Sequence, residues 1–180
     1  MKVLIVIDMQ HDFIDGVLGS PEAQAIVPNV VAKVAQYAAD SEGVVMYTMD
    51  SHLEDYMDTM EGHYLPVPHC IVGTHGWEVI PEVKRDDIET VYHRKPNFGS
   101  LSLPHAIMAH AGMVSGSSDV DSIELVGVCT DICVITNALL LKTYYNDIPI
   151  KVDSSCCAGV TPAKHEAALE VMRSCQIEVI

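Results

Sequence analysis

Short apolar, β-branched runs alternate along this chain with segments in which apolar residues recur every three or four positions. The runs are continuously apolar, a pattern typical of strands that are buried on both faces. Such strands are joined by helices through right-handed crossovers and form parallel sheets. We therefore predict an α/β fold, a three-layer doubly wound sandwich whose six-stranded, mainly parallel sheet has helices on both faces. The predicted strands are residues 3–7, 43–49, 89–93, 123–128, 148–152 and 176–180.

Three helices are predicted from apolar stripes that include Val30, Val134 and Ala167. The chain has 180 residues, 49% of them hydrophobic, which is enough for one substantial core, so we expect a single domain over residues 1–180. Two segments lack periodicity. Residues 112–121 are predicted to form a flexible polar loop at the surface, and residues 50–84, rich in His, Asp, Met and Pro, form a loop long enough to be functional.

The charge and hydropathy of the chain exclude several classes of partner. A formal net charge of -15 would repel a phosphate backbone or an anionic membrane surface, so we expect no nucleic acid and no membrane as partners. A small substrate, uncharged or locally complemented, fits better. The apolar N-terminal run is interrupted by Asp8, and no stretch approaches the roughly 18 apolar residues of a membrane span. We expect a soluble, cytoplasmic protein.

The cysteines are predicted to be free thiols, because a chain that forms its own core does not need disulfides. By default each is a small buried hydrophobic residue. Cys156 and Cys157 are assigned no role beyond burial. The six cysteines are Cys70, Cys129, Cys133, Cys156, Cys157 and Cys175.

Reactive side chains follow the first four predicted strands. Ligands of open α/β sheets bind beyond the carboxyl ends of the strands, near the point where strand order reverses. Asp8 follows the first strand, Asp50 and His52 the second, Lys95 the third and Cys133 the fourth. We expect these residues to converge.

Cys133 lies in the stretch GVCTDICV, residues 127–134, which ends a strand and opens a helix, with Thr130 or Asp131 as the expected N-cap. In the first helical turn, free backbone amides and the helix dipole favour the thiolate, the reactive form of cysteine. The same amides would stabilise a tetrahedral oxyanion. The alternative is that Cys133 only packs against the sheet.

Asp8 ends an apolar strand, where an unpaired carboxylate would be costly to bury. A lysine, or a thiol whose proton it accepts, would compensate the charge, and partial desolvation would shift its pKa toward the range useful for acid–base catalysis. A helix N-cap is the alternative role. Lys95 lies beside Pro96 and Gly99, which force irregular backbone. A lone lysine there is usually a solvated surface charge, and only its expected convergence with Asp8 and Cys133 singles it out.

A metal site is predicted from Asp50, His52 and His69. Residues i and i+2 of an extended segment point the same way, so Asp50 and His52 can chelate one ion, and His69 would close the site from across the loop. One carboxylate and two imidazoles suit zinc, iron or manganese. Either neighbouring carboxylate would add a ligand, directly or through water, whereas lone loop histidines are usually solvated. The carboxylates are Glu54 and Asp55, and the loop histidines, which are not assigned as ligands, are His63 and His75.

Five motifs occur in an order that resembles the isochorismatase-like cysteine hydrolases, and among them the nicotinamidase branch. The similarity extends over nearly the whole chain. The motifs are IDMQHDF (7–13), DSH (50–52), PHCIVGTHG (68–76), KPNFGS (95–100) and GVCTDICV (127–134).

The resemblance implies a catalytic triad of Asp8, Lys95 and Cys133. It also implies one divalent metal ion, with zinc favoured over iron or manganese, held by the three metal-site residues named above. The backbone amides of Cys129 and Cys133 would form the oxyanion hole, after a cis peptide between Val128 and Cys129. The implied reaction is deamidation of a small-molecule amide, nicotinamide, to nicotinic acid and ammonia through a cysteine thioester, and the implied assembly is a homo-oligomer.

The substrate pocket departs from the family pattern. Phe13 matches a pocket position where an aromatic ring can stack on a pyridine. The tryptophan common in nicotinamidases is Pro66 here, and a frequent pocket aromatic is replaced by Ile132. We expect Tyr64 to substitute for the missing ring.

Three other readings remain open from the residues. One is a metal-free relative that acts on another small amide, a carbamoyl compound or a vinyl ether. The second is a catalytically inactive binding module, which the three intact triad positions disfavour. The third is a flavodoxin-like cofactor binder, which residues 8–13 disfavour because they offer no phosphate-binding glycine or hydroxyl cluster.

Overall fold

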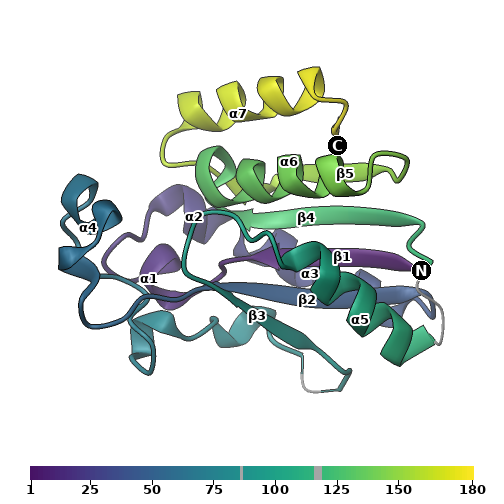
Figure 1. The fold of residues 1–180 in the computed structure, drawn as a ribbon, viewed down its shortest axis with the longest axis horizontal. Helices are drawn as coiled ribbons and strands as arrows, with labels where there is room; N and C mark the ends of the chain where they lie inside the picture. Colours follow the sequence, from purple (N-terminus) through teal and green to yellow (C-terminus); the bar gives the residue numbers. More distant parts are fainter. Residues whose placement is uncertain (86, 116–118) are drawn as a thin grey trace.

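A computed structural model describes residues 1–85, 87–115 and 119–180 of the protein. Its sheet has six strands in the order β3-β2-β1-β4-β5-β6, and every pairing is parallel (Figure 1). The strands are β1 Lys2–Ile7, β2 Gly43–Asp50, β3 Val91–Lys95, β4 Ser122–Val128, β5 Ile150–Ala158 and β6 Glu178–Val179. The predicted doubly wound α/β architecture is confirmed.

Helices cover both faces of this sheet, with α5 and α6 in front of it and α3 behind it in Figure 1. None of the helices in the described residues is both long and apolar enough to cross a membrane. The α-helices are α1 His11–Ile14, α2 Pro21–Ala25, α3 Val27–Ala39, α4 Met60–Tyr64, α5 Leu103–Ser115, α6 Ile135–Tyr144 and α7 Pro162–Ser174. The short 3-10 helices are η1 Tyr56–Asp58, η2 His75–Trp77 and η3 Pro81–Val83, and a π-helix, η4, covers Thr130–Val134.

Alternate residues of β1 enter two separate cores, because successive side chains of a strand point to opposite faces. Val3 and Ile5 pack in a cluster with residues of α5, α6 and α7. Leu4 and Val6 pack in the other with residues of α2 and α3. All four side chains are fully buried. Burial on both faces explains why the strands are continuously apolar.

Several predicted boundaries are wrong. β3 begins two residues later than expected, and β5 runs on to Ala158 through a polar stretch that the sequence pattern ended at residue 152. Helix α5 was missed, and its last turn covers residues 112–115 of the predicted loop. The rest of that loop, residues 116–118, lies outside the described residues. All six cysteines are free, as expected, and Cys156 and Cys157 are buried.

The chain reverses its direction of travel across the sheet between β1 and β4. From β1 it moves outward to β2 and β3, then returns to the other side of β1 to form β4, β5 and β6. Ligands bind at such a switch point, beyond the carboxyl ends of the strands. Asp8 follows β1 and Cys133 follows β4 at this place.

Candidate active site

Three reactive side chains meet at the switch point. The Lys95 Nζ lies 2.6 Å from Asp8 Oδ2 and 3.5 Å from Cys133 Sγ. Lys95 ends β3, two strands away from β1, so its long side chain spans the width of β2 to reach Asp8. Asp8 and Lys95 are fully buried and Cys133 is 5% exposed. The expected convergence of these three residues is therefore present in the structure.

Asp8 is held in place by its neighbour on β2. The Thr48 hydroxyl donates a 2.6 Å hydrogen bond to Asp8 Oδ1 and accepts a 3.2 Å bond from the Asp8 amide. Asp8 itself adopts a left-handed φ of 48°, which is uncommon for a residue other than glycine and turns the chain at the end of β1. The carboxylate therefore has a fixed direction, with one oxygen on Thr48 and the other on Lys95.

Close approach of β1 and β4 depends on Gly127. Its φ is +117°, and a Cβ at this position would lie 2.1 Å from the carbonyl oxygen of Ile7. Real atoms do not approach so closely, so only glycine fits between the strands here. The two strands carry Asp8 and Cys133 immediately beyond this contact.

Burial and charge set the protonation states of the triad. Burial raises the pKa of the Asp8 carboxyl, and Lys95 opposes this rise. Burial would lower the pKa of the Lys95 ammonium, but the charges of Asp8, Cys133 and Asp50 outweigh it and raise that pKa. Burial, followed by the negative charge of Asp8, holds the pKa of the Cys133 thiol well above its usual range. These shifts favour a neutral Cys133 thiol and a protonated Lys95, whose Nζ lies within ion-pair distance of Asp8.

The turn that carries Cys133 is wider than an α-helical one. The carbonyl oxygen of Cys129 accepts hydrogen bonds from the amides of Ile132 and Val134 at 3.0 and 3.1 Å. The N-cap residue is Cys129, which makes no side-chain cap, so the expected caps are wrong. The expected caps, Thr130 and Asp131, make other hydrogen bonds. Thr130 Oγ1 lies 2.8 Å from His165 Nδ1, and Asp131 Oδ1 accepts from the Val160 amide at 2.9 Å. The cis peptide Val128–Cys129 is present, as the resemblance implied.

A second cluster, here called the metal cluster, consists of Asp50, His52, Glu61 and His69. One donor atom from each of the four lies within 4.8 Å of all the others. Asp50 Oδ2 is 3.0 Å from His52 Nε2 and 3.6 Å from His69 Nε2, and Glu61 Oε1 is 3.8 Å from both nitrogens. Two carboxylates and two imidazoles that point at one spot could hold a divalent ion such as zinc.

Neighbouring groups orient the metal cluster. His69 Nδ1 donates to the Val67 carbonyl at 2.8 Å, which fixes the ring with Nε2 directed at Asp50 Oδ2, 3.6 Å away. The Gln10 side chain makes two hydrogen bonds to the Asp50 backbone. Its Nε2 donates to the carbonyl at 2.9 Å, and its Oε1 accepts from the amide at 2.7 Å. Hydrogen bonds from His52 and His69 overcome the effect of burial and lower the pKa of Asp50, so this carboxyl is ionised.

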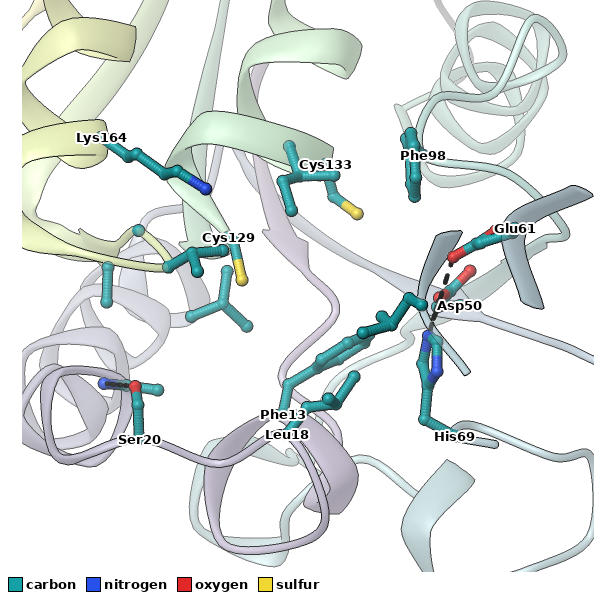
Figure 2. Close-up of a pocket in the computed structure, with 17 residues that line it drawn as sticks. Phe13, Leu18, Ser20, Asp50, Glu61, His69, Phe98, Cys129, Cys133 and Lys164 are labelled. Atoms are coloured by element: carbon teal, nitrogen blue, oxygen red, sulfur yellow. Dashed lines mark hydrogen bonds and ion pairs between the residues drawn. The ribbon is translucent and has the colours of Figure 1, made fainter. Parts of the chain in front are cut away.

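Cys133 from the first group and three residues of the metal cluster line one cavity of about 320 Å³ (Figure 2). Asp50, Glu61 and His69 form one end of its wall, and Cys133 lies beside them. Apolar residues make up most of the remainder, which is typical of pockets that bind small molecules. The other lining residues are Phe13, Leu18, Ser20, Ala23, Leu65, Phe98, Val128, Cys129, Ile132, Ala158, Gly159, Val160 and Lys164.

Comparison with known proteins agrees with this geometry. Residues 2–180 match the isochorismatase domain family. The chain belongs to this family. It is 27% identical to the nicotinamidase/pyrazinamidase of Mycobacterium tuberculosis over 100% of this chain and 98% of that protein. Among solved structures, the pyrazinamidase/nicotinamidase of Streptococcus mutans is 27% identical with a TM-score of 0.80, over 100% of both chains.

A further solved structure shares the fold at lower identity. The pyrazinamidase of Pyrococcus horikoshii, solved in complex with zinc, has a TM-score of 0.77 and 24% identity, over 99% of this chain and 98% of that one. The family assignment and the geometry together identify the chain as an isochorismatase-like hydrolase.

The structure differs from the sequence analysis at several site residues. Tyr64, expected in the pocket, is 87% exposed and does not line the cavity, because α4 turns that side chain outward. Glu61 was missed, yet it lines the cavity next to the metal cluster histidines. Thr59 could have indicated Glu61, because an N-cap residue there predicts the short helix α4 that carries this carboxylate. Phe98 and Lys164 were also missed as lining residues. The two carboxylates suggested as further donors, Glu54 and Asp55, lie outside the metal cluster, and so do the loop histidines His63 and His75, which were not expected to be ligands.

Replacing Glu61 with glutamine is expected to weaken zinc binding by at least about 100-fold, since one anionic ligand is lost. The measurement is a competition titration against a chromogenic chelator at neutral pH. Glu54→Gln provides the matched control, because Glu54 is an exposed carboxylate in the same loop. Equal zinc affinities for the Glu61 variant and the unmodified protein would remove Glu61 from the metal cluster.

Proposed function

We propose that this protein is a metal-assisted cysteine amidohydrolase that converts nicotinamide to nicotinic acid and ammonia. The observation that carries the proposal is one shared cavity: Cys133 lies on its wall beside Asp50 and His69, with the Asp8–Lys95 ion pair directly behind the thiol. A nucleophile, a proton acceptor and a place to anchor a heteroaromatic ring are thus within reach of one small molecule. The nicotinamidase relatives support the same reaction.

The residues of the metal cluster fit a divalent ion. Asp50 Oδ1 is buried without a hydrogen-bond partner and reaches the Lys95 ammonium only at 3.6 Å, so it has a lone pair to offer a cation. The mixed carboxylate and imidazole set suits zinc, the ion in the Pyrococcus horikoshii structure, and iron or manganese as alternatives. When bound, such an ion would supply a Lewis-acidic anchor for the pyridine nitrogen.

The chain's own residues would perform the covalent chemistry. Asp8 accepts the proton of the Cys133 thiol, and the thiolate attacks the carboxamide carbon. Lys95 and the backbone amides of Cys129 and Cys133 stabilise the oxyanion. When the C–N bond breaks, Asp8 returns the proton to the departing ammonia and a thioester remains. Water, deprotonated by Asp8, then cleaves the thioester and releases nicotinic acid.

Aromatic rings would position the substrate. Phe13 lies edge-on to the His69 ring, with ring centroids 5.5 Å apart, and lines the cavity together with Phe98. A flat pyridine ring that reaches the metal cluster must pass these residues. Ring stacking contributes about 1 kcal/mol beyond burial. In this proposal Phe98, rather than Tyr64, takes the place of the tryptophan that is Pro66 here.

The test is ammonia release from nicotinamide, pyrazinamide and a panel of unrelated small amides. We expect turnover of the two heteroaromatic amides, a loss of at least about 10²-fold when a chelator strips the metal, and recovery with added zinc. Zinc-loaded protein that leaves nicotinamide intact would contradict the proposal. Turnover of another amide or carbamoyl compound that survives complete metal removal would instead identify a metal-free relative.

A further inference from the structure

The cavity continues past Cys133, away from the metal cluster. In Figure 2 the Cys133 sulfur lies between the carboxylates of Asp50 and Glu61 on one side and the amine of Lys164 on the other. We call the part beyond Cys133 the distal lobe. Figure 2 places Ser20, Cys129 and Lys164 on this side, and they contribute one hydroxyl, one thiol and one amine to the wall.

Lys164 has no partner for its charge. Its Nζ makes no ion pair or hydrogen bond within the described residues, and only its backbone amide is engaged, by Thr161 Oγ1 at 3.2 Å. It lies in the first turn of α7, where the positive end of the helix dipole disfavours a cation, and that turn contains no acidic residue. Lys164 is solvent-exposed and lines the cavity with no counter-charge among the described residues.

The charge of Lys164 acts on the distal lobe. Burial raises the pKa of the Cys129 thiol to about 12, and Lys164 opposes this rise, whereas Asp131 adds to it. Asp131 is the nearby anion, but its Oδ1 is occupied by the amide of Val160. The whole chain carries a formal charge of -15, so an anionic molecule is repelled everywhere except near a local cation. Lys164 supplies such a cation on the cavity wall.

We propose that Lys164 binds a carboxylate that the substrate carries at the end remote from the metal cluster. This inference rests on the proposed function, which places the ring at the metal cluster and the scissile carbonyl carbon at Cys133. Whatever extends from that carbon toward Lys164 is attached through the amide nitrogen. The substrate class is therefore a heteroaromatic amide whose amine portion ends in a carboxylate, such as an N-acylglycine.

The chemistry of this class is the same hydrolysis with a larger leaving group. The C–N bond breaks, the acyl group passes to Cys133 and then to water, and Asp8 returns the thiol proton to the departing amine. One water is consumed, and the products are the heteroaromatic acid and the free amino acid. No oxidant or other co-reactant is needed.

The experiment measures binding instead of turnover, so that it does not depend on catalysis. In zinc-loaded protein carrying Cys133→Ala, the dissociation constants of N-nicotinoylglycine and of its neutral analogue N-nicotinoylglycinamide are compared by calorimetry. We expect the carboxylate to bind about tenfold more tightly at low salt, as a charge-assisted hydrogen bond provides. The preference should fall to near one when Lys164→Met is added.

Two further variants control for the loss of charge. Lys164→Arg should keep most of the preference, and Lys142→Met should keep all of it, because Lys142 Nζ bonds to the Asn146 carbonyl at the far end of α6. The inference is overturned if the two ligands bind equally, if the preference survives Lys164→Met, or if the carboxylate does not bind at millimolar concentration. Nicotinamide turnover by the unmodified enzyme is measured separately. Turnover without charge preference rejects this inference alone, whereas charge preference without turnover rejects nicotinamide as the substrate.

Discussion

Substituting alanine for Cys133 is expected to lower ammonia release from nicotinamide by at least about 10⁴-fold, because the thiol beside Asp8 and Lys95 that would form the thioester is lost. The change removes only the sulfur and keeps the Cβ, so the fold should persist. The measurement is initial-rate ammonia release with circular dichroism as a check on folding. Alkylation of the intact enzyme with iodoacetamide, followed by peptide mapping, should show loss of activity in proportion to modification of Cys133.

The matched control for this variant is Cys175→Ala, since Cys175 is exposed and lies outside the cavity lining. It should retain full activity. Turnover by the Cys133 variant within about tenfold of the unmodified enzyme would remove this residue from the role of nucleophile, whatever the metal content of the protein.

Replacing Asp8 with asparagine is expected to have opposite effects on turnover and on thiol reactivity. Amide hydrolysis should fall by about 10²- to 10⁴-fold, because asparagine can neither accept the thiol proton nor return it to ammonia. Burial raises the pKa of Cys133 and so does the Asp8 carboxylate, whereas Lys95 lowers it. Removing Asp8 leaves Lys95 as the dominant charge, so the thiolate should form at lower pH and alkylation at neutral pH should become faster.

The pH profile of iodoacetamide alkylation measures this change directly, and its midpoint should move down in the Asp8 variant. Lys95 keeps Asp50 Oδ1 at 3.6 Å as a counter-ion, so the variant does not leave a buried ammonium alone. Asp58→Asn, a change of the same type at an exposed position, should leave both the midpoint and turnover unaltered. An unchanged or higher midpoint in the Asp8 variant would show that Asp8 does not control ionisation of the thiol.

The sequence predicts the triad well because a parallel sheet gathers the carboxyl ends of its strands at one edge. Asp8 and Cys133 follow adjacent strands, β1 and β4, so their meeting follows from the architecture. The position of Lys95 is harder to predict, because β2 separates β3 from β1 and local hydropathy does not reveal the order of the strands. Convergence of Lys95 was expected because it follows a strand end, and the resemblance to a family implied its role in a triad. The 2.6 Å contact with Asp8 shows that the side chain reaches across β2.

Three other features depend on tertiary packing and could not be predicted from local sequence patterns. Glu61 lies on a short helix inside a long loop, where no periodicity exists and tertiary packing decides which side chain faces the histidines. Lys164 comes from α7, late in the chain, and only the folded cavity shows that it faces the same space as Cys133. The polar end of β5 was missed because burial of Asp153 depends on a partner, Lys33 Nζ at 2.8 Å, that is remote in sequence.

The close contact between Gly127 and the Ile7 carbonyl sets the distance between β1 and β4, and so the distance between the reactive side chains that follow them. Any side chain there would act as a wedge between β1 and β4 at the end of the sheet where proton and sulfur must meet. The spacing of Asp8 and Cys133 thus depends on the absence of a side chain at Gly127, a residue that takes no part in the chemistry. Substitution of Gly127 would lower activity by changing that spacing, although no reacting atom is altered.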